Sequence, residues 1–215
     1  MCSSQVKDTP FPQIHHPRAS AFYEWLASRR SVQRLMAPLR EEAVGQASGL
    51  VLEVGAGSGR NFPFYSPERV ERVEAVEPDA TMLQYARERL AQARVPLSLV
   101  QAPAEALPFA DATFDSAVAT LVFCSVLNPR QAFEEVKRVL KPGGHLFLVE
   151  HVRAQGKVAA ALQDALVPLT TWAGGDCHWN RETLQTLIES GFEVVSLRQQ
   201  GGGLQPIFIV HAARP

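Results

Sequence analysis

The fold is decided by one stretch of sequence, Leu50-Val51-Leu52-Glu53-Val54-Gly55-Ala56-Gly57-Ser58-Gly59. Four of its first five residues are aliphatic, which is typical of a buried strand. Three glycines at alternate positions follow and predict a tight turn, because glycine reaches positive φ without strain and lets a ligand approach the backbone. A strand that leads through such a turn into a helix is typical of an α/β fold. Ligands of these folds bind at the carboxyl edge of the sheet, where this turn lies.

The rest of the chain alternates between short β-branched runs and helical stretches. Further strands are expected at about 71–76, 97–101, 114–119, 145–150, 192–198 and 206–211. Strands that are separated by helices pair in parallel, so the pattern predicts a mostly parallel sheet with helices packed against it.

Several helix boundaries are readable in the sequence. Asp79 and Asn128 are expected to cap two helices, because their side chains can accept hydrogen bonds from the first helical N–H groups. A further helix covers about 157–167 and ends at Pro168, since proline lacks an N–H and clashes with the preceding turn. Asn180 is expected to cap the last helix.

The chain divides into three parts. Residues 1–18 are rich in proline and have no hydrophobic period, so we expect a flexible arm. Residues 19–48 place apolar side chains on one side of one or two helices and are expected to form a helical cap. Residues 49–215 then form a single α/β domain of ordinary size.

Composition and charge exclude several classes of protein. With 46% hydrophobic and 20% charged residues, the chain is a globular protein and not a disordered one. With a net charge of −1, the protein lacks the overall positive potential that non-specific nucleic-acid binding needs. No stretch has the ~18 consecutive apolar residues of a membrane span, and the first residues do not resemble a secretory signal. We expect a soluble, cytoplasmic protein with no nucleic-acid partner and no integral membrane segment.

The three cysteines, Cys2, Cys124 and Cys177, show no C-x-x-C spacing. This argues against a disulfide scaffold and against a thiolate zinc site. The consecutive residues Asp176, Cys177 and His178 are too compact to surround one ion. No metal site is expected.

A second ligand-binding position ends the predicted second strand. Glu77 lies 18 residues beyond Gly59, and a carboxylate there can accept hydrogen bonds from both hydroxyls of a ribose. The alternative interpretation is that Glu77 is only a solvated charge at the end of the strand and binds no ligand. Arg60 stands where the last glycine of G-x-G-x-x-G would be, so the turn disfavours a nicotinamide dinucleotide.

The chain resembles the class I methyltransferases that use S-adenosylmethionine, of the methyltransferase type 11 group. Four segments carry the resemblance, namely V-L-E-V-G-A-G-S-G, V-E-P-D-A-T-M-L, A-E-A-L-P-F-A-D-A-T-F-D and R-V-L-K-P-G-G. Residues 120–126, 150–152 and 175–183 are in addition similar to the methyltransferase-like alkyl thiol S-methyltransferases. The resemblance implies a Rossmann-like sheet of seven strands, parallel apart from the last, with helices on both faces.

The resemblance also implies a site for S-adenosyl-L-methionine. By the motif matches, Glu53 and the three glycines hold the methionine end of the cofactor, and Glu77 holds the ribose. Met82 would pack on the adenine, although a methionine there is also an ordinary core residue. The cofactor-binding positions that follow are Glu53, Gly55, Gly57, Gly59, Glu77, Met82, Ala104 and Thr120.

Candidate catalytic residues lie on the acceptor side. Methyl transfer from a sulfonium is an in-line displacement, so positioning of the acceptor can supply much of the acceleration. A base helps if the acceptor is a thiol, because the thiolate is the nucleophile. His151, Asp176 and His178 are the candidates, and His151 is the best placed because it follows the central strand. A purely structural role is the alternative for each histidine, and Cys124 is expected to be a buried apolar side chain.

The sequence therefore predicts a transferase, an S-adenosylmethionine-dependent methyltransferase whose acceptor is a small molecule, with an alkyl thiol as the leading candidate. One alternative is a phospholipid or small-amine N-methyltransferase, which the helix with Phe22, Trp25 and Leu26 would bring into peripheral contact with a membrane. Another is a cofactor-binding regulator without catalysis. Residues 1–45 are expected to control access of the acceptor and not to hold the cofactor.

Overall fold

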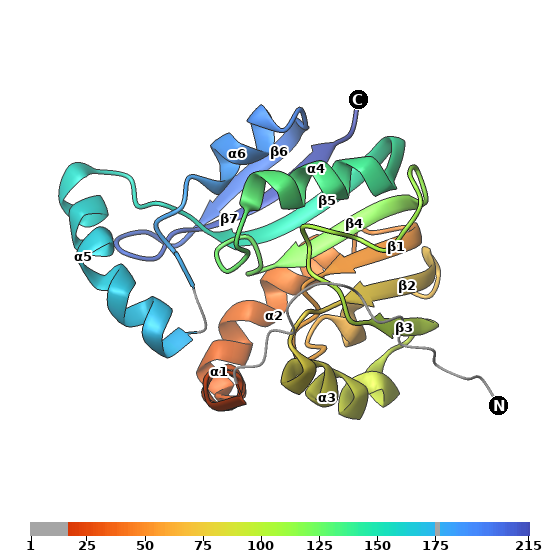
Figure 1. The fold of residues 1–215 in the computed structure, drawn as a ribbon, viewed down its shortest axis with the longest axis horizontal. Coiled ribbons are helices and arrows are strands. Elements are labelled where there is room, and N and C mark those ends of the chain that lie inside the picture. Colours follow the sequence, from red (N-terminus) through yellow and green to blue (C-terminus); the bar gives the residue numbers. More distant parts are fainter. Residues whose placement is uncertain (1–16, 175–176) are drawn as a thin grey trace.

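The computed structural model describes residues 17–174 and 177–215. Its sheet has seven strands in the order β3-β2-β1-β4-β5-β7-β6 (Figure 1). β7 runs antiparallel to both of its neighbours, and the remaining strand pairs are parallel, as predicted. The strands are β1 (Gly49–Val54), β2 (Val70–Val76), β3 (Leu97–Val100), β4 (Phe114–Thr120), β5 (Leu140–His151), β6 (Glu193–Gln200) and β7 (Ile207–Ala213).

Helices cover both faces of the sheet. They are α1 (Pro17–Ala27), α2 (Arg30–Val44), α3 (Ala80–Arg89), α4 (Pro129–Val139), α5 (Lys157–Gly174) and α6 (Thr183–Glu189). α4 and α6 pack together on one face, and α2 packs on β5 and β7 from the other (Figure 1). α5 stands out beyond the sheet and contacts α1. None of the helices in the described part of the chain combines the length and hydrophobicity needed to span a bilayer.

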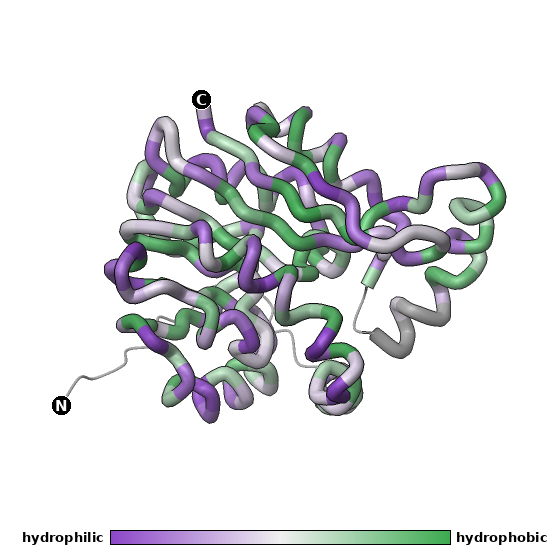
Figure 2. The backbone as a smooth tube through the Cα atoms, turned by 180° about the vertical axis from the view of Figure 1, so that it is seen from behind, coloured by the Kyte–Doolittle hydropathy of each residue, from purple (hydrophilic) through white to green (hydrophobic). Residues whose placement is uncertain are grey.

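The sheet separates two layers of apolar core. Successive side chains of a strand point to opposite faces, so Leu52 packs in the layer beneath α4 and its neighbour Val51 in the layer beneath α2. Figure 2 shows hydrophobic residues running along the central strands, as expected for a parallel sheet that is buried on both faces. Phe133 of α4 and Leu39 of α2 fill the two layers.

The register of the central strands brings their carboxyl ends to one edge. Val54 of β1 pairs with Val76 of β2 on one side and with Ala119 of β4 on the other. Thr120 in turn pairs with Val149 of β5. The residues that follow these strands therefore meet at a single edge.

The predicted caps of two helices are confirmed. Asp79 accepts hydrogen bonds from the backbone N–H groups of Thr81 (2.6 Å) and Met82 (3.2 Å) at the start of α3. Asn128 accepts from the N–H of Gln131 (3.2 Å) at the start of α4. All three bonds span only two or three residues, so the local sequence suffices to predict them.

Two boundary predictions are wrong. α5 continues through Pro168 to Gly174, so the proline costs the helix one backbone hydrogen bond without ending it. In the turn that follows, the hydroxyl of Thr171 donates to the carbonyls of Val167 (3.0 Å) and Pro168 (3.1 Å).

Asn180 does not cap α6, which begins at Thr183 with Glu182 at the N-cap position. The amide of Asn180 instead donates to Asp164 of α5 (2.8 Å). The hydrogen bond to Asp164, 16 positions earlier, thus holds the Asn180 side chain in place of the predicted capping bond.

Helices α1 and α2 occupy the stretch that was expected to be a helical cap. α2 is part of the main core, since Leu39 and Val44 are buried beneath the sheet. The arm expected at residues 1–18 lies outside the described residues except for Pro17 and Arg18, which begin α1.

Candidate active site at the carboxyl edge of the sheet

The three glycines of the turn after β1 all have positive φ, between +54° and +78°. A Cβ on Gly55 would overlap the side chain of Val122, and a Cβ on Gly59 would overlap the ring of Phe62. A Cβ on Gly57 would make only ordinary contacts, with the Met82 methyl carbon at 3.7 Å and the Gly55 carbonyl oxygen at 4.0 Å. Two of the glycines are therefore needed for packing within the protein, whereas the backbone of Gly57 remains open to a ligand.

Glu77 follows β2 and organises this turn. One carboxylate oxygen accepts the backbone N–H of Gly57 (2.9 Å) and the other accepts the N–H of Asp79 (2.9 Å). The residue is buried, and burial raises the pKa of Glu77 to about 7. Each oxygen retains a lone pair that a ligand hydroxyl can use, so the geometry fits the predicted ribose contact.

Glu53, inside β1, is fully buried. Its Oε2 accepts a hydrogen bond from the hydroxyl of Tyr65 (2.9 Å), and its Oε1 has no partner among the described residues. Burial raises the pKa of Glu53 to about 7. A buried carboxylate oxygen without a donor is uncommon, and an ammonium group of a cofactor would satisfy it.

A buried polar chain connects α2 to the end of β4. The guanidinium of Arg40 donates to Asn61, and the amide of Asn61 donates to the hydroxyl of Thr120 (3.2 Å). Arg40, Asn61 and Thr120 are all buried. Thr120 thus lies where the sequence places it, whereas Arg40 and Asn61 were not predicted.

Helix α1 packs against the cofactor side of the edge. The Ser20 hydroxyl donates to Asp79 (2.9 Å), and Glu24 forms ion pairs with Arg60 (2.6 Å) and Arg89 (2.5 Å). Residues 1–45 are predicted to control access of the acceptor and not to hold the cofactor, and these contacts place α1 beside the glycine turn and α3. Glu24 carries no local motif that would reveal this role.

The acceptor side is built by the turn after β4 and the end of β5. Glu150 accepts the backbone N–H groups of Val122 (2.6 Å) and Phe123 (2.9 Å) through a single oxygen, and its Oε2 has no partner in the described residues. Burial raises the pKa of Glu150 to about 8. The carboxyl therefore fixes the turn that Leu121 enters with a φ of +58°.

His151, the last residue of β5, lies in a group with Cys124 and Cys177, whose potential ligand atoms are all within 4.8 Å of one another. The backbone N–H of His178 donates to the carbonyl of Cys124 (2.7 Å), so this predicted residue adjoins the group. Asp176, the third catalytic candidate, lies outside the described residues.

The remaining predicted cofactor positions lie at the same edge. Met82 is in the first turn of α3 and faces Gly57, and Ala104 is buried in the loop after β3. Glu53, the glycine turn, Glu77 and Thr120 belong to or follow β1, β2 and β4. The edge thus combines an open backbone, a buried unpartnered carboxylate oxygen and a ribose-type acceptor.

A family profile described as a methyltransferase domain matches residues 52–148, which hold most of this edge. The protein of Rattus norvegicus named thiol S-methyltransferase TMT1B is 32% identical over 203 residues, which cover 93% of this chain and 82% of that protein. The chain belongs to the S-adenosylmethionine-dependent methyltransferases. Membership implies S-adenosyl-L-methionine as the methyl donor, and Glu53, Gly57 and Glu77 are residues that fit it.

Other similarities of this methyltransferase are more distant. A protein of Cereibacter sphaeroides named phosphatidylethanolamine N-methyltransferase is 36% identical over 125 residues, which cover 57% of this chain and 61% of that protein. The crystal structure of a SAM-dependent methyltransferase from Aquifex aeolicus has a TM-score of 0.65 at 21% identity and covers 91% of this chain and 98% of that one. The structural likeness shows the fold alone.

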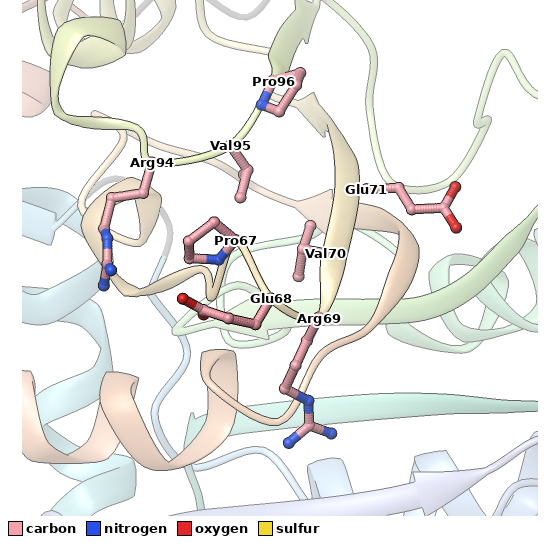
Figure 3. Close-up of a pocket in the computed structure, with 8 residues that line it drawn as sticks. All are labelled: Pro67, Glu68, Arg69, Val70, Glu71, Arg94, Val95 and Pro96. Carbon is pink, nitrogen blue, oxygen red and sulfur yellow. The ribbon is translucent and has the colours of Figure 1, made fainter.

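The methyltransferase also has a pocket of about 440 Å³ at the opposite edge of the sheet (Figure 3). Its lining, residues 67–71 and 94–96, belongs to the segments that lead into β2 and β3. In Figure 3 the charged ends of Arg69, Glu71 and Arg94 point away from one another. None of the predicted site residues lines this pocket, so the chemistry is assigned to the carboxyl edge.

The ligand-free methyltransferase is expected to lose stability as the pH rises from about 5 to about 8. Burial raises the pKa values of Glu53, Glu77 and Glu150 to about 7, 7 and 8, above the ordinary 4.5. Their protonated forms stabilise the fold fully below the unfolded pKa, and this contribution disappears as pH passes through the folded pKa. A thermal melt measures the effect, at roughly 2–4 °C per kcal/mol for a chain of this size.

The variant Glu150→Gln isolates one of these groups, since the amide oxygen can still accept the two backbone N–H groups. Its melting temperature should depend less on pH than that of the wild type. Glu71→Gln, an exposed change on β2, is the control and should keep the wild-type slope. A melting temperature that rises between pH 5 and 8 would show that these carboxyls are ionised in the folded protein.

Proposed function

We propose that this methyltransferase transfers a methyl group to the sulfur of a small alkyl thiol. One observation carries the proposal. The three segments in which the sequence resembles alkyl thiol S-methyltransferases, residues 120–126, 150–152 and 175–183, contribute Cys124, His151 and Cys177 to a single group of side chains. The three segments that resemble alkyl thiol S-methyltransferases therefore meet beside the proposed cofactor site, where an acceptor would bind. The rat relative's name, thiol S-methyltransferase, supports the same acceptor class.

The residues of the edge have distinct parts in this proposal. S-adenosyl-L-methionine, when bound, supplies an electrophilic methyl group. Glu53 accepts hydrogen bonds from the cofactor's ammonium group, Glu77 accepts from its ribose hydroxyls, and the open backbone of Gly57 lets it approach. Glu150 fixes the turn that carries Cys124, and His151 takes the proton of the acceptor. Alignment of acceptor and methyl group is the main source of rate, because the leaving group is already a good one.

A panel of acceptors with labelled cofactor tests the proposal. Alkyl thiols should be methylated on sulfur, with a rate that rises with pH as the thiolate accumulates. His151→Ala should lower turnover by up to ~10²–10⁴-fold, the usual range for a general base, with little change in cofactor affinity. His211→Ala is the matched control, because His211 pairs with His145 (3.0 Å) on β5 and β7, away from the cofactor edge. Turnover of amines with no turnover of any thiol would overturn the proposal.

A second candidate is N-methylation of a phospholipid. Helix α1 exposes Phe22 (47%) and Trp25 (53%), whose rings stack at 5.7 Å, and the guanidinium of Arg29 lies 3.9 Å from the Trp25 ring centroid. An exposed aromatic face beside basic residues favours contact with a lipid surface. The likeness to the protein named phosphatidylethanolamine N-methyltransferase supports this candidate. Vesicles that contain phosphatidylethanolamine belong in the same panel, where their methylation would select it.

A further inference from the structure

The group formed by Cys124, His151 and Cys177 has a chemistry that methyl transfer alone does not require. Two sulfur atoms and one imidazole nitrogen lie within 4.8 Å of one another. They come from three separate places, the turn after β4, the end of β5 and the segment between α5 and α6. The two cysteines are 53 positions apart, so no sequence motif predicts that they lie together.

We propose that Cys124, His151 and Cys177 bind a zinc-class divalent cation, with a fourth coordination position open to the thiol acceptor. Thiolate and imidazole are the ligands that zinc prefers, and three protein ligands with one open position are typical of its catalytic sites. The evidence for a metal site is the geometry of the three side chains. Occupation of the fourth position by a thiol rests on the function proposed above.

The dimensions suit this assignment. Tetrahedral zinc with bonds of about 2.3 Å to sulfur and 2.0–2.1 Å to nitrogen sets its ligand atoms roughly 3.3–3.8 Å apart. The present separations of up to 4.8 Å need to close by about 1.5 Å at most, which small rotations about the Cα–Cβ bonds can provide. The Nδ1 atom of His151 is buried and has no hydrogen-bond partner among the described residues. The ring also hydrogen-bonds to Cys124, which places it in the group while one of its nitrogens has no partner.

The charges of the group also suit a divalent cation. When such an ion binds, both thiols ionise, and their two negative charges neutralise it. Glu150 and Arg181 are ionisable side chains near the group.

The open position would prepare the acceptor for reaction. A thiol that binds there forms a sulfur–metal bond and releases its proton to solvent, so a thiolate exists at neutral pH. In the metal-bound protein the cation thus replaces His151 as the group that ionises the acceptor, and His151 acts as a ligand. Its sulfur then forms a bond to the methyl carbon as the donor's sulfonium–methyl bond breaks, and that electron pair stays on the donor's sulfur. The products are two neutral thioethers and one proton. A thioether binds zinc more weakly than a thiolate, so the product can leave.

Cobalt(II) titration of the reduced, metal-free protein tests the site without any use of activity. We expect one Co²⁺ per chain, with the ultraviolet charge-transfer absorption of cobalt–thiolate bonds, and displacement by Zn²⁺. Cys124→Ser and Cys177→Ser should each reduce this absorption, and the double variant should abolish it. His151→Ala should weaken Co²⁺ binding by at least ~10-fold, in the range that loss of a metal-site partner typically costs.

Matched controls separate this site from other thiols and histidines of the chain. Cys2→Ser removes the third cysteine, and His211→Ala breaks the remote pair with His145, so both should leave the Co²⁺ spectrum intact. Zn²⁺ should also protect two of the three thiols of the wild type from alkylation, a readout that does not depend on any variant folding. Absence of the absorption in the wild type, or its survival in the double cysteine variant, would overturn the site.

The fourth position has its own test. Adding a small alkyl thiol to the Co²⁺-loaded protein should increase and shift the charge-transfer absorption as a third sulfur binds. No change on addition would overturn the open position, whatever the acceptor panel shows. Methylation of amines alone, with an intact Co²⁺ spectrum, would overturn the proposed function and the thiol ligand while supporting the metal site.

Discussion

Gly57→Val is expected to raise the dissociation constant for S-adenosylhomocysteine beyond the range that calorimetry can measure, while the protein remains folded. Gly57 has a φ of +54°, and inside the protein its added Cβ would come no closer than 3.7 Å to any atom, the Met82 methyl carbon being the nearest. The space above its backbone is therefore the space that the proposed cofactor site needs, and a branched side chain would fill it. The backbone strain of ~1–2 kcal/mol at positive φ is too small to unfold a typical domain.

Two further glycine variants separate strain from loss of ligand space. Gly143 has a φ of +74° and nothing within 4 Å of an added Cβ, so Gly143→Val carries similar strain and should bind the ligand normally. Gly59→Val should unfold the protein, since the new side chain would overlap the Phe62 ring. Tight binding by a folded Gly57→Val protein would remove the glycine turn from the cofactor site.

Local sequence was sufficient to predict where the residues of the proposed cofactor site lie in the fold. The strand before Gly55, the glycine turn itself and the caps at Asp79 and Asn128 depend on residues within a few positions of one another. Glu77 was predictable because a parallel sheet brings the ends of adjacent strands together whatever their side chains are. In each case the determining interaction is local, or follows from the topology alone.

Long-range side-chain contacts were not predictable in this way. Arg40 reaches Asn61 across 21 positions, and Asn61 reaches Thr120 across 59. Each is an ordinary polar residue in its own segment, and only the packed core shows that it is buried with a partner. The same reason explains the wrong prediction at Asn180, where the carboxylate of Asp164 on α5 binds the side chain that was expected to cap α6.

The cysteines illustrate the limit most clearly. Spacing in the sequence argued against a metal site, because no two cysteines stand close enough to form a motif. The fold nevertheless brings the potential ligand atoms of Cys124, His151 and Cys177 within 4.8 Å of one another. Spacing rules detect ligands that share one turn or hairpin, and they miss ligands that a sheet edge gathers from separate crossovers.

Glu77→Ala is expected to weaken the affinity for S-adenosylhomocysteine by roughly 10–100-fold, which corresponds to the ~1.5–3 kcal/mol of hydrogen bonds to a charged group. The change removes the proposed ribose acceptor and also frees the backbone N–H groups of Gly57 and Asp79. Calorimetry of the folded variant measures the loss. Glu71→Ala is the matched control, because Glu71 is an exposed glutamate on the same strand, near its other end.

Glu77→Gln should lose nearly as much affinity as Glu77→Ala. Both carboxylate oxygens accept a backbone N–H, so the amide of glutamine would have to point its NH₂ group at one of these donors. Protonation places a hydroxyl in the same position, and with a pKa of about 7 the wild-type affinity should itself fall as the pH is lowered from 8 to 6. Unchanged affinity in both variants would show that another residue binds the ribose and that Glu77 serves only to hold the glycine turn.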